Sequence, residues 1–339
     1  MALDPTLLAD ISELYGVSPD ALHPATGGHF SHVFEYSAHG QACILRITPP
    51  NTDVDRHAMQ AILEWLAFLA EQGGPVVRPL RSLSGSLIEA VAFAEQTYLA
   101  VAFEKAPGVL AEGMSPGEWS DELIQALGCT VGHCHRLAQQ YFPARPELKR
   151  PQWDSGTSCF NPKEALVDAD RLILEKRTQV LNHIQALPKE VESYGLAHLD
   201  LHFGNFFVDI PHQKIVLFDF DDCAYGWYIM DLAMLLFDVL VVYDGADRRE
   251  FGERFLLNLL RGYITQVQVS SFWISQLPHF LKLLEIGLYA MLYREYDTST
   301  ADWWVSRFMP GRRERIEQDL PYVELDFEVI FNRVLSFGG

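Results

Sequence analysis

Residues 195–222 read GLAHLDLHFGNFFVDIPHQKIVLFDFDD, and this stretch decides the fold. It contains His198-x-Asp200, then Asn205 five residues after Asp200, and Asp219 fourteen residues after Asn205. In phosphoryl transfer, an Asp near the nucleophile accepts the hydroxyl proton, while an Asn amide oxygen and a second carboxylate hold Mg²⁺ against the phosphates. The stretch therefore contains the residue types that this chemistry needs.

The spacing predicts that these side chains converge. Apolar runs at 206–208 and 215–218 are joined by a turn at 211–213, which indicates a β-hairpin. The first two polar residues precede the hairpin, and Asp219 ends its second strand. Capping of a loop or a turn explains any one of the three alone, but not all three jointly.

A metal-dependent hydrolase is an alternative interpretation of the same stretch. His198, Asp200 and His202 form H-x-D-x-H, which on a strand would present three zinc ligands on one face. A hydrolase needs further ligands, and the nearest candidates are His133-Cys134-His135. They lie in a predicted helix, where residues two apart point to different faces, so packing roles suit them better.

The chain before the hairpin divides into a β-rich and an α-rich part. We expect strands at 30–37, 42–48, 86–94 and 97–103, and a helix at about 54–72. His39-Gly40 joins the first two strands, and Gly73-Gly74 ends the helix. Glu104-Lys105-Ala106-Pro107-Gly108 is a turn-rich crossing that we expect to be the hinge between two lobes.

Beyond the hinge the pattern becomes mainly helical. We expect helices at 115–141, at 161–187 and from 231 to nearly the end. Ser115-Pro116-Gly117-Glu118 has the spacing of a capping box, and Asn161-Pro162 begins the second helix. A chain of 339 residues exceeds the roughly 250–300 at which single cores stop growing. The sequence thus predicts an α+β fold with a small β-rich N-lobe, residues 1–104, and a large helical C-lobe, residues 105–339.

The net charge of −19 limits the partners of the chain. Such a chain repels nucleic acid and anionic membranes unless a basic patch is segregated, and the sequence shows none. Arg312, Arg313 and Arg315 form the only basic cluster, and interspersed acidic residues indicate a solvated helix face. We therefore expect neither nucleic acid nor membrane as a partner. An acidic protein can also steer a cationic substrate, although charge that only keeps the protein soluble is the favoured interpretation.

The cysteines and the N-terminus predict a cytoplasmic protein. The five cysteines are scattered and form no C-x-x-C pair, so reduced and mostly buried thiols are expected. The first residues lack the basic and apolar regions of a signal peptide. The longest apolar run, at 232–243, is too short to span a bilayer and contains Asp238.

The stretch at 195–222 resembles the aminoglycoside phosphotransferase and choline kinase superfamily of protein-kinase-like enzymes. Their motif is H-G-D-x-x-x-x-N followed by I-D-F-D, and the resemblance extends over most of the chain. It is greatest for the bacterial branch that holds type II homoserine kinases and related stress-response kinases. The resemblance implies that Asp200 is the catalytic base, that Asn205 and Asp219 bind Mg²⁺, and that His198 orients the loop.

Three further positions near this motif are interpreted from the same resemblance. Leu199 replaces the usual Gly, which we expect to be tolerated if that backbone avoids positive φ. Asp221 is expected to brace the loop rather than to bind metal. Asp231 is expected either to cap the next helix or to anchor the catalytic loop.

The resemblance also implies a nucleotide site in the N-lobe. The phosphate-covering loop contains Gly27, Gly28, Ser31 and His32. Two glycines before a strand usually make only a turn, so this assignment depends on the position of the loop relative to the catalytic motif.

A cation on the third strand grips the phosphates in kinase-like folds. Arg46 occupies the position of the usual Lys, and a surface role is the alternative. Glu64 is the candidate for its helix partner, although it sits late in the helix and a solvent-exposed role fits equally. Adenine is expected at the hinge backbone near Phe103 to Lys105.

The acceptor site is expected between the catalytic loop and the C-terminal helices. Late aromatic residues could pack in the core or form a cage for a cationic ligand: Tyr289, Tyr293, Tyr296, Trp303 and Trp304. Asp238, Asp244 and Glu285 are candidates for acceptor contacts, with structural roles as the favoured interpretation.

The sequence therefore predicts a kinase that transfers the γ-phosphate of ATP, through Mg²⁺, to a hydroxyl of a small-molecule acceptor. The acidic large lobe favours an acceptor that bears an amine. Two alternatives stay open. One is a catalytically silent nucleotide-binding regulator of the same fold, and the other is a protein Ser/Thr kinase.

Overall fold

The computed structural model describes residues 3–25, 31–38, 40–49, 56–155, 160–162, 171–243, 245–293 and 302–336. The chain divides into two compact units. Unit 1 comprises Met1–Pro107, Tyr141–Arg150 and Val216–Asp221. Unit 2 comprises Gly108–Gln140, Pro151–Ile215 and Asp222–Gly339. The chain therefore first passes from unit 1 to unit 2 within the crossing that the sequence analysis interprets as a hinge.

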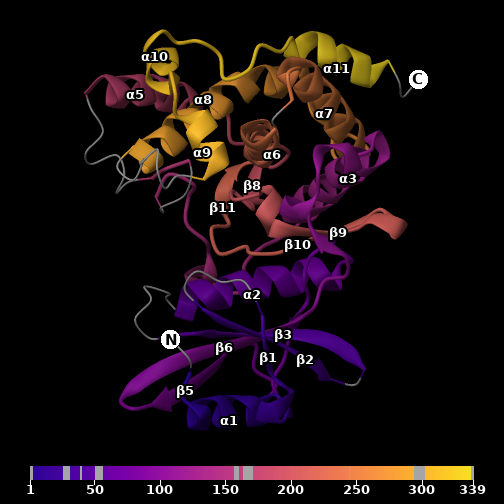
Figure 1. The fold of residues 1–339 in the computed structure, drawn as a ribbon, viewed down its shortest axis with the longest axis vertical. Coiled ribbons are helices and arrows are strands. Elements are labelled where there is room, and N and C mark those ends of the chain that lie inside the picture. Colours follow the sequence, from indigo (N-terminus) through magenta and orange to yellow (C-terminus); the bar gives the residue numbers. More distant parts are fainter. Residues whose placement is uncertain are drawn as a thin grey trace. The chain divides into compact units, whose positions relative to one another are not determined.

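Unit 1 is an antiparallel sheet with a helix on each face (Figure 1). Its elements are α1 (Pro5–Leu14), β1 (His23–Pro24), β2 (His32–Ala38), β3 (Gln41–Thr48), α2 (Arg56–Glu71), β4 (Pro79–Leu80), β5 (Glu89–Phe93) and β6 (Gln96–Glu104). The strands pair in the order β1-β2-β3-β6-β4. Strand β5 pairs with the first part of β6, and β4 pairs with its end.

Alternation of side chains along the strands supplies both faces of this sheet. One face packs on α1 in a cluster that includes Leu7, Ile11, Leu45, Ile47, Ala100 and Ala102. The other face packs on α2 in a cluster that includes Met59, Leu63, Leu99 and Val101. Arg46 follows Leu45 along β3 and pairs in register with Val101, so it belongs to the α2 face.

The prediction of a single helix in this part of the chain is wrong, because α1 precedes the sheet. The Asp4 carboxylate accepts a hydrogen bond from the Thr6 amide at 2.8 Å, and Pro5 occupies the first turn. This is the ordinary signature of a helix start. The predicted strands and the helix at 54–72 are confirmed to within a few residues over the part that the structure describes.

Unit 2 is largely helical, with short strands between its helices (Figure 1). Its helices are α3 (Asp121–Ala138), α5 (Arg171–Gln185), α6 (Ile229–Val242), α7 (Arg248–Tyr263), α8 (Ser271–Tyr293), α9 (Trp303–Phe308), α10 (Arg312–Glu317) and α11 (Phe327–Leu335). Its strands are β7 (Val109–Leu110), β8 (Tyr194–Ala197), β9 (Phe206–Asp209) and β11 (Ala224–Trp227), and β10 (Lys214–Leu217) begins in it. The expected α+β class and the hairpin of β9 and β10 are confirmed.

One boundary in unit 2 differs from the prediction, and a second predicted boundary adjoins residues outside the described ranges. Ser115 does form a capping box, since its amide and hydroxyl bind Glu118 at 2.7 and 2.8 Å, but this closes only a 3-10 turn. Helix α3 begins after Ser120, whose hydroxyl accepts a hydrogen bond from the Leu123 amide at 3.2 Å. The predicted start at Asn161-Pro162 is followed by residues outside the described ranges, and α5 begins at Arg171.

Helices α3 and α7 approach each other closely because glycines face the contact. A Cβ atom on Gly128 would lie 1.9 Å from the Leu259 carbonyl oxygen, and one on Gly262 would lie 1.8 Å from the Gln125 carbonyl oxygen. No side chain larger than hydrogen fits at either position without moving the backbone. The close approach also places His135 of α3 beside Tyr263 of α7.

We expect Gly262→Ala to lower the free energy of unfolding by about 1–3 kcal/mol, because overpacking forces the two helices apart. Chemical denaturation of the variant measures this loss. Gly113→Ala is the matched control, since a Cβ there meets no atom within 4 Å. Equal stability of the two variants would contradict the close helix contact.

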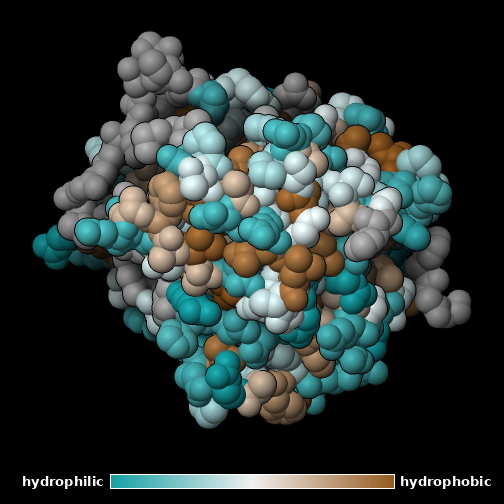
Figure 2. Space-filling model, turned by 90° about the horizontal axis from the view of Figure 1, so that it is seen from below, coloured by the Kyte–Doolittle hydropathy of each residue, from teal (hydrophilic) through white to brown (hydrophobic). Residues whose placement is uncertain are grey.

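The surface seen in Figure 2 shows apolar atoms in small areas divided by hydrophilic side chains. Exposed apolar residues of unit 1 include Leu83, which is 75% exposed, and Phe142. Scattered residues of this kind are normal on a protein surface. Among the described helices, none is long and apolar enough to cross a membrane.

Candidate active site

The candidate catalytic loop lies in unit 2 between β8 and β9. The side-chain amide nitrogen of Asn205 donates hydrogen bonds to the main-chain carbonyl of Asp200 at 2.8 Å and to its carboxylate at 3.1 Å. The same nitrogen lies 3.1 Å from Nε2 of His202. These contacts fix the Asp200 carboxylate and use only the amide nitrogen of Asn205. The amide oxygen of Asn205 takes part in none of these three contacts.

Asp231 anchors the start of this loop from α6. Its carboxylate accepts hydrogen bonds from the amides of His198 at 3.0 Å and Leu199 at 2.7 Å. Nε2 of His135 lies 2.9 Å from the same carboxylate, and Nδ1 of His135 lies 3.0 Å from the Tyr263 hydroxyl. The alternative role as a helix cap is wrong, because α6 begins two residues before Asp231.

This network keeps a fully buried carboxylate ionised. Burial alone would raise the pKa of Asp231, but the hydrogen bond and charge of His135, the charge of His198 and the amide of Leu199 together lower it. An ionised carboxylate only accepts hydrogen bonds, so His135 donates to Asp231 from Nε2, while its Nδ1 faces the Tyr263 hydroxyl. Helices α3, α6 and α7 thus fix the loop together.

Leu199 is expected to replace the usual Gly without cost only if its backbone avoids positive φ. The structure contradicts this condition. The φ of Leu199 is +63°, the left-handed region that favours glycine. Two contacts hold this conformation: the hydrogen bond from its amide to Asp231, and complete burial of its side chain. The packing offsets a conformational cost of about 1–2 kcal/mol.

His202 lies among carboxylates in the same loop. Burial disfavours its charged form, but its hydrogen bond to Asp200 and the charges of Asp200, Asp238 and Glu112 raise the pKa of His202 to about 9. Asp238 accepts a hydrogen bond from the Phe203 amide at 2.8 Å, while burial raises the pKa of its carboxyl. His202 thus lies beside Asp200, and its Nδ1 accepts a hydrogen bond from the Gly204 amide at 3.0 Å.

The metal-ligand interpretation of the H-x-D-x-H residues gains no support from this environment. Nε2 of His202 lies 3.6 Å from the Asp200 carboxylate, and its Nδ1 is occupied by the Gly204 amide at 3.0 Å. Within the described residues, no group of three or more His, Cys, Asp or Glu side chains is placed to hold a metal. His135, the nearest further candidate ligand, is already bonded to Asp231 and Tyr263.

The candidate phosphate-binding residues lie in unit 1. Arg46 donates two hydrogen bonds to Asp221, at 3.0 and 3.2 Å, and lies 3.9 Å from Asp219. Asp219 follows β10, has a φ of +60° and a side chain that is 46% exposed. Its carboxylate is thus turned out of the strand and accessible. Asp221 braces Arg46 rather than the catalytic loop.

Glu64 does not form an ion pair with Arg46 in the structure. Its carboxylate accepts a hydrogen bond from Gln60 at 3.0 Å and lies 3.8 Å from Arg145. Among the ion pairs of the described residues, the carboxylates beside Arg46 are those of Asp221 and Asp219.

The other proposed nucleotide residues that the structure describes lie on or next to strands of the sheet. Gly27 and Gly28 lie outside the described residues. The Ser31 hydroxyl lies 3.1 Å from that of Thr48, and His32 is paired with Ile47. Phe103 lies on β6 in register with Ile44 and under the Arg46 guanidinium, 6.0 Å from its ring centre.

Lys105 is the last candidate nucleotide residue of unit 1. It pairs with Glu35 at 2.6 Å, and its amide bonds the Ala42 carbonyl at 2.9 Å. Its backbone thus continues the sheet by one residue.

A cavity of about 750 Å³ opens onto the catalytic loop within unit 2. Its acidic lining consists of Asp200, Asp238 and Glu112. Aromatic side chains from Trp119, Trp303 and Trp304 also line it. We call this cavity the acceptor pocket. Glu112 and Trp119 were not identified from the sequence, because nothing in their local pattern distinguishes them from other turn and helix-start residues.

The late aromatic residues have mixed roles. Tyr289 is buried and packs 5.5 Å from the Tyr293 ring, whereas Trp303 and Trp304 line the acceptor pocket. Tyr296 lies outside the described residues. The cage interpretation therefore applies to the two tryptophans.

The three acidic residues proposed to contact the acceptor have different locations. Asp238 lines the acceptor pocket. Glu285 is fully buried and bonds Arg312 at 2.6 Å and Lys282, which is a structural role. Asp244 lies outside the described residues.

The antiparallel sheet of unit 1, the helical unit 2 and the loop with Asp200 and Asn205 define a phosphotransferase with a protein-kinase-like fold. A family model described as "Phosphotransferase enzyme family" matches residues 22–272, more than half of the chain. The chain belongs to this family. The superfamily that the sequence resembles is thereby confirmed.

Similar proteins agree with this assignment. Amicoumacin kinase of Bacillus subtilis (strain 168) is 32% identical over 329 residues, which cover 96% of this chain and 95% of the relative. A solved structure of amicoumacin kinase hAmiN in complex with AMP-PNP, Ca²⁺ and Ami is 28% identical, with a TM-score of 0.83 and 97% of each chain covered. A microcompartment-associated aminopropanol kinase shares the fold, with 20% identity, a TM-score of 0.68 and coverage of 94% of this chain and 98% of that one.

Proposed function

We propose that this protein transfers the γ-phosphoryl group of ATP, with Mg²⁺, to a hydroxyl of a small molecule that bears an amine. The observation that carries the proposal is the Asp200 carboxylate, held by Asn205 at the wall of an acidic and aromatic pocket. The amicoumacin kinase relatives support a small-molecule acceptor. The finer similarity to homoserine kinases stays a prediction.

The residues of the loop have complementary roles in this proposal. Asp200 accepts the proton of the acceptor hydroxyl, and the Asn205 amide holds it in position for that transfer. The Asn205 amide oxygen and the accessible Asp219 carboxylate are hard oxygen donors of the kind that Mg²⁺ prefers. Bound Mg²⁺ would supply neutralisation of phosphate charge. Arg46 would bind phosphate oxygens through its guanidinium.

The acceptor pocket favours an amine for two reasons. Three carboxylates line it, and the lining contains no Lys or Arg among the described residues. The faces of Trp303 and Trp304 attract ammonium groups as well. A cationic acceptor would therefore be held near Asp200.

A panel of alcohols with ATP and Mg²⁺ tests the proposal, with amicoumacin as the first acceptor. We expect turnover of amino alcohols, and at least about tenfold lower kcat/KM for their N-acetylated forms, which corresponds to about 1.4 kcal/mol of lost charge interaction. Chelation by EDTA should stop turnover. Equal kcat/KM values for the amino alcohols and their N-acetylated forms would refute the preference for an amine. Turnover that requires Zn²⁺ would favour a hydrolase.

One observation favours the second candidate function, a silent nucleotide-binding regulator. Arg46 is already paired with Asp221, so a phosphate must compete with that carboxylate. A regulator would gain stability from Mg²⁺-ATP and show no turnover with any acceptor in the panel. Phosphorylation confined to protein substrates would instead favour a protein Ser/Thr kinase.

A further inference from the structure

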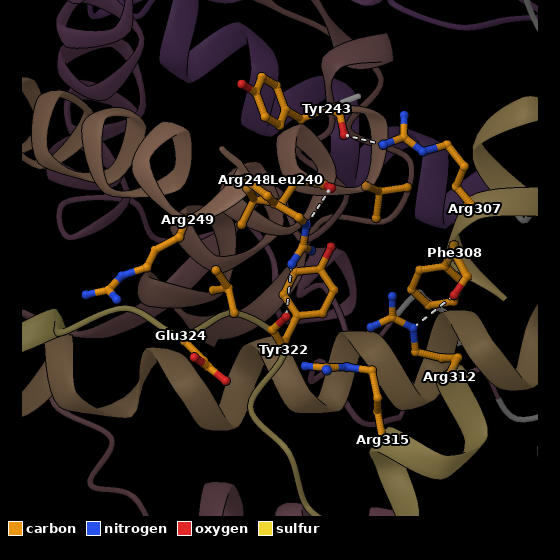
Figure 3. Close-up of a pocket in the computed structure, with 12 residues that line it drawn as sticks. Leu240, Tyr243, Arg248, Arg249, Arg307, Phe308, Arg312, Arg315, Tyr322 and Glu324 are labelled. Atoms are coloured by element: carbon orange, nitrogen blue, oxygen red, sulfur yellow. Dashed lines mark hydrogen bonds between the residues drawn. The ribbon is translucent and has the colours of Figure 1, made fainter. Parts of the chain in front are cut away.

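A second cavity in unit 2, of about 440 Å³, is lined by arginines from three helices. They are Arg248 and Arg249 of α7, Arg307 of α9, and Arg312 and Arg315 of α10. We call this cavity the arginine pocket. Figure 3 shows the guanidinium groups of Arg248, Arg312 and Arg315 gathered around the Tyr322 side chain.

The arginine pocket corrects two expectations from the sequence. Arg312 does not belong to a solvated helix face, since its side chain is only 12% exposed and bonds the buried Glu285. A basic patch is also segregated, although the chain as a whole is acidic. The sequence conceals it, because its arginines come from two segments, 248–249 and 307–315, that are 58 residues apart.

Most of the positive charge in this pocket is not neutralised by the protein. Arg248 bonds the carbonyls of Leu240 and Tyr322, each at 3.2 Å, and Arg307 bonds that of Tyr243 at 3.3 Å. A carbonyl occupies an N–H donor but leaves the charge of the guanidinium in place.

Arg315 is held in the same way, by the Pro321 carbonyl at 2.7 Å. Within the described ranges, no carboxylate lies at ion-pair distance from Arg248, Arg249, Arg307 or Arg315. Glu324 is the acidic residue of the lining. Four positive charges around one small cavity repel one another, and an anion would relieve this repulsion.

The arginine side chains are held in place by aromatic rings. The Arg248 guanidinium lies 4.7 Å from the Tyr322 ring centre, and that of Arg312 lies 4.3 Å from the Phe308 ring centre. The Tyr322 hydroxyl is itself fixed by the Phe237 carbonyl at 3.0 Å. Fixed side chains lose little conformational freedom on binding, which favours affinity.

We propose that the arginine pocket binds a small molecule with two or more oxyanion groups, phosphates or carboxylates. The planar guanidinium fork matches both groups through paired hydrogen bonds. The volume of the pocket lies within the range of small-molecule sites, roughly 300–1,000 Å³. Arg249 and Arg307 line the pocket and are exposed, so an anion in solution can reach them.

Binding in this pocket would be transmitted to the acceptor pocket through α9. This helix places Trp303 and Trp304 in the acceptor pocket, and Arg307 in the arginine pocket. Tyr243 lines both cavities, and its carbonyl holds Arg307. An anion bound to Arg307 would therefore change the KM for the acceptor. This consequence rests on the proposed function, whereas binding itself does not.

Calorimetric titration with pyrophosphate and with citrate, at constant ionic strength, tests the proposal. Saturating AMP-PNP and Mg²⁺ keep the probes out of the nucleotide site. We expect Arg249→Gln/Arg307→Gln to weaken probe binding at least tenfold. The matched control is Arg171→Gln/Arg333→Gln, which removes the same charge from exposed ion pairs with Glu175 and Glu253, and it should bind as the wild type does.

The outcomes separate specific binding from general charge attraction. The proposal is supported if either probe binds the wild type and the control variant but binds the pocket variant more weakly. The probe that binds more tightly then assigns phosphate or carboxylate chemistry. Equal loss in both double variants would overturn it, because overall charge would then explain the binding. Absence of heat with either probe in the wild type would overturn it as well.

Discussion

Asp200→Asn is expected to lower the rate of phosphoryl transfer by about 10²–10⁴-fold, the usual contribution of a general base. The substitution keeps the size of the side chain and its hydrogen bond with Asn205, but an amide cannot take the proton of the acceptor hydroxyl. Thermal stabilisation by Mg²⁺-ATP should persist, because the nucleotide residues that we propose lie in unit 1. Single-turnover rates and thermal shifts measure the two effects separately.

The control for this variant is Asp209→Asn. Asp209 lies on β9 in the same segment, and its carboxylate bonds His212 at the surface, 2.9 Å away. We expect wild-type transfer from it. If Asp200→Asn retained transfer within tenfold of the wild type, Asp200 would not be the base. Asp238 and Glu112, the other carboxylates of the acceptor pocket, would then be the next candidates.

The predictable parts of this fold are those with a local signal. The hairpin of β9 and β10 follows from two apolar runs around a Pro-containing turn, and β2 and β3 follow from alternation around His39-Gly40. Asp200 and Asn205 could be chosen because their spacing within one loop is itself the signal. Their contact in the structure involves only residues five apart.

The parts that could not be predicted depend on contacts between distant segments. Arg312 belongs to a run of alternating charges that is typical of a solvated helix, and its partner Glu285 comes from α8. The positive φ of Leu199 is set by Asp231, which lies 32 residues further on. Glu112 becomes part of the acceptor pocket only through packing.

Helix α1 is a different case, because its local signal was present. Asp4-Pro5 is a helix start by capping and by backbone preference. Leu7 and Ile11 are buried and Leu14 packs against the same cluster, so the apolar residues also recur at helical spacing. Alternation along β3 places Leu45 and Ile47 on the sheet face opposite to Arg46. Apolar side chains on that face need a second helix to bury them, and this requirement predicts α1.

Asp231→Asn is expected to lower the free energy of unfolding by about 3–5 kcal/mol, as loss of one partner from a buried ion pair does. The Asn amide group would face the amide of His198 or Leu199, or the Nε2 proton of His135, where a donor meets a donor. At about 2–4 °C per kcal/mol for a unit of this size, Tm should fall by 6 °C or more. Scanning calorimetry measures it.

The pH dependence of this loss follows from the lowered pKa of Asp231. A carboxyl with a pKa below its unfolded value of about 3.9 contributes stability above that pH, and loses it as the pH falls through the folded pKa. The difference in Tm between wild type and variant should therefore be constant between pH 5 and pH 8. It should shrink only in more acid solution.

The same substitution should also lower kcat, because Asp231 holds the backbone of His198 and Leu199 just before Asp200, the proposed catalytic base. Ile330→Ala separates this positioning effect from stability, since Ile330 is buried on α11 and its truncation costs about 2–5 kcal/mol. Assayed well below both melting temperatures, Ile330→Ala should keep the wild-type kcat and Asp231→Asn should not. Equal kcat values in the two variants would show that Asp231 stabilises unit 2 without positioning the loop.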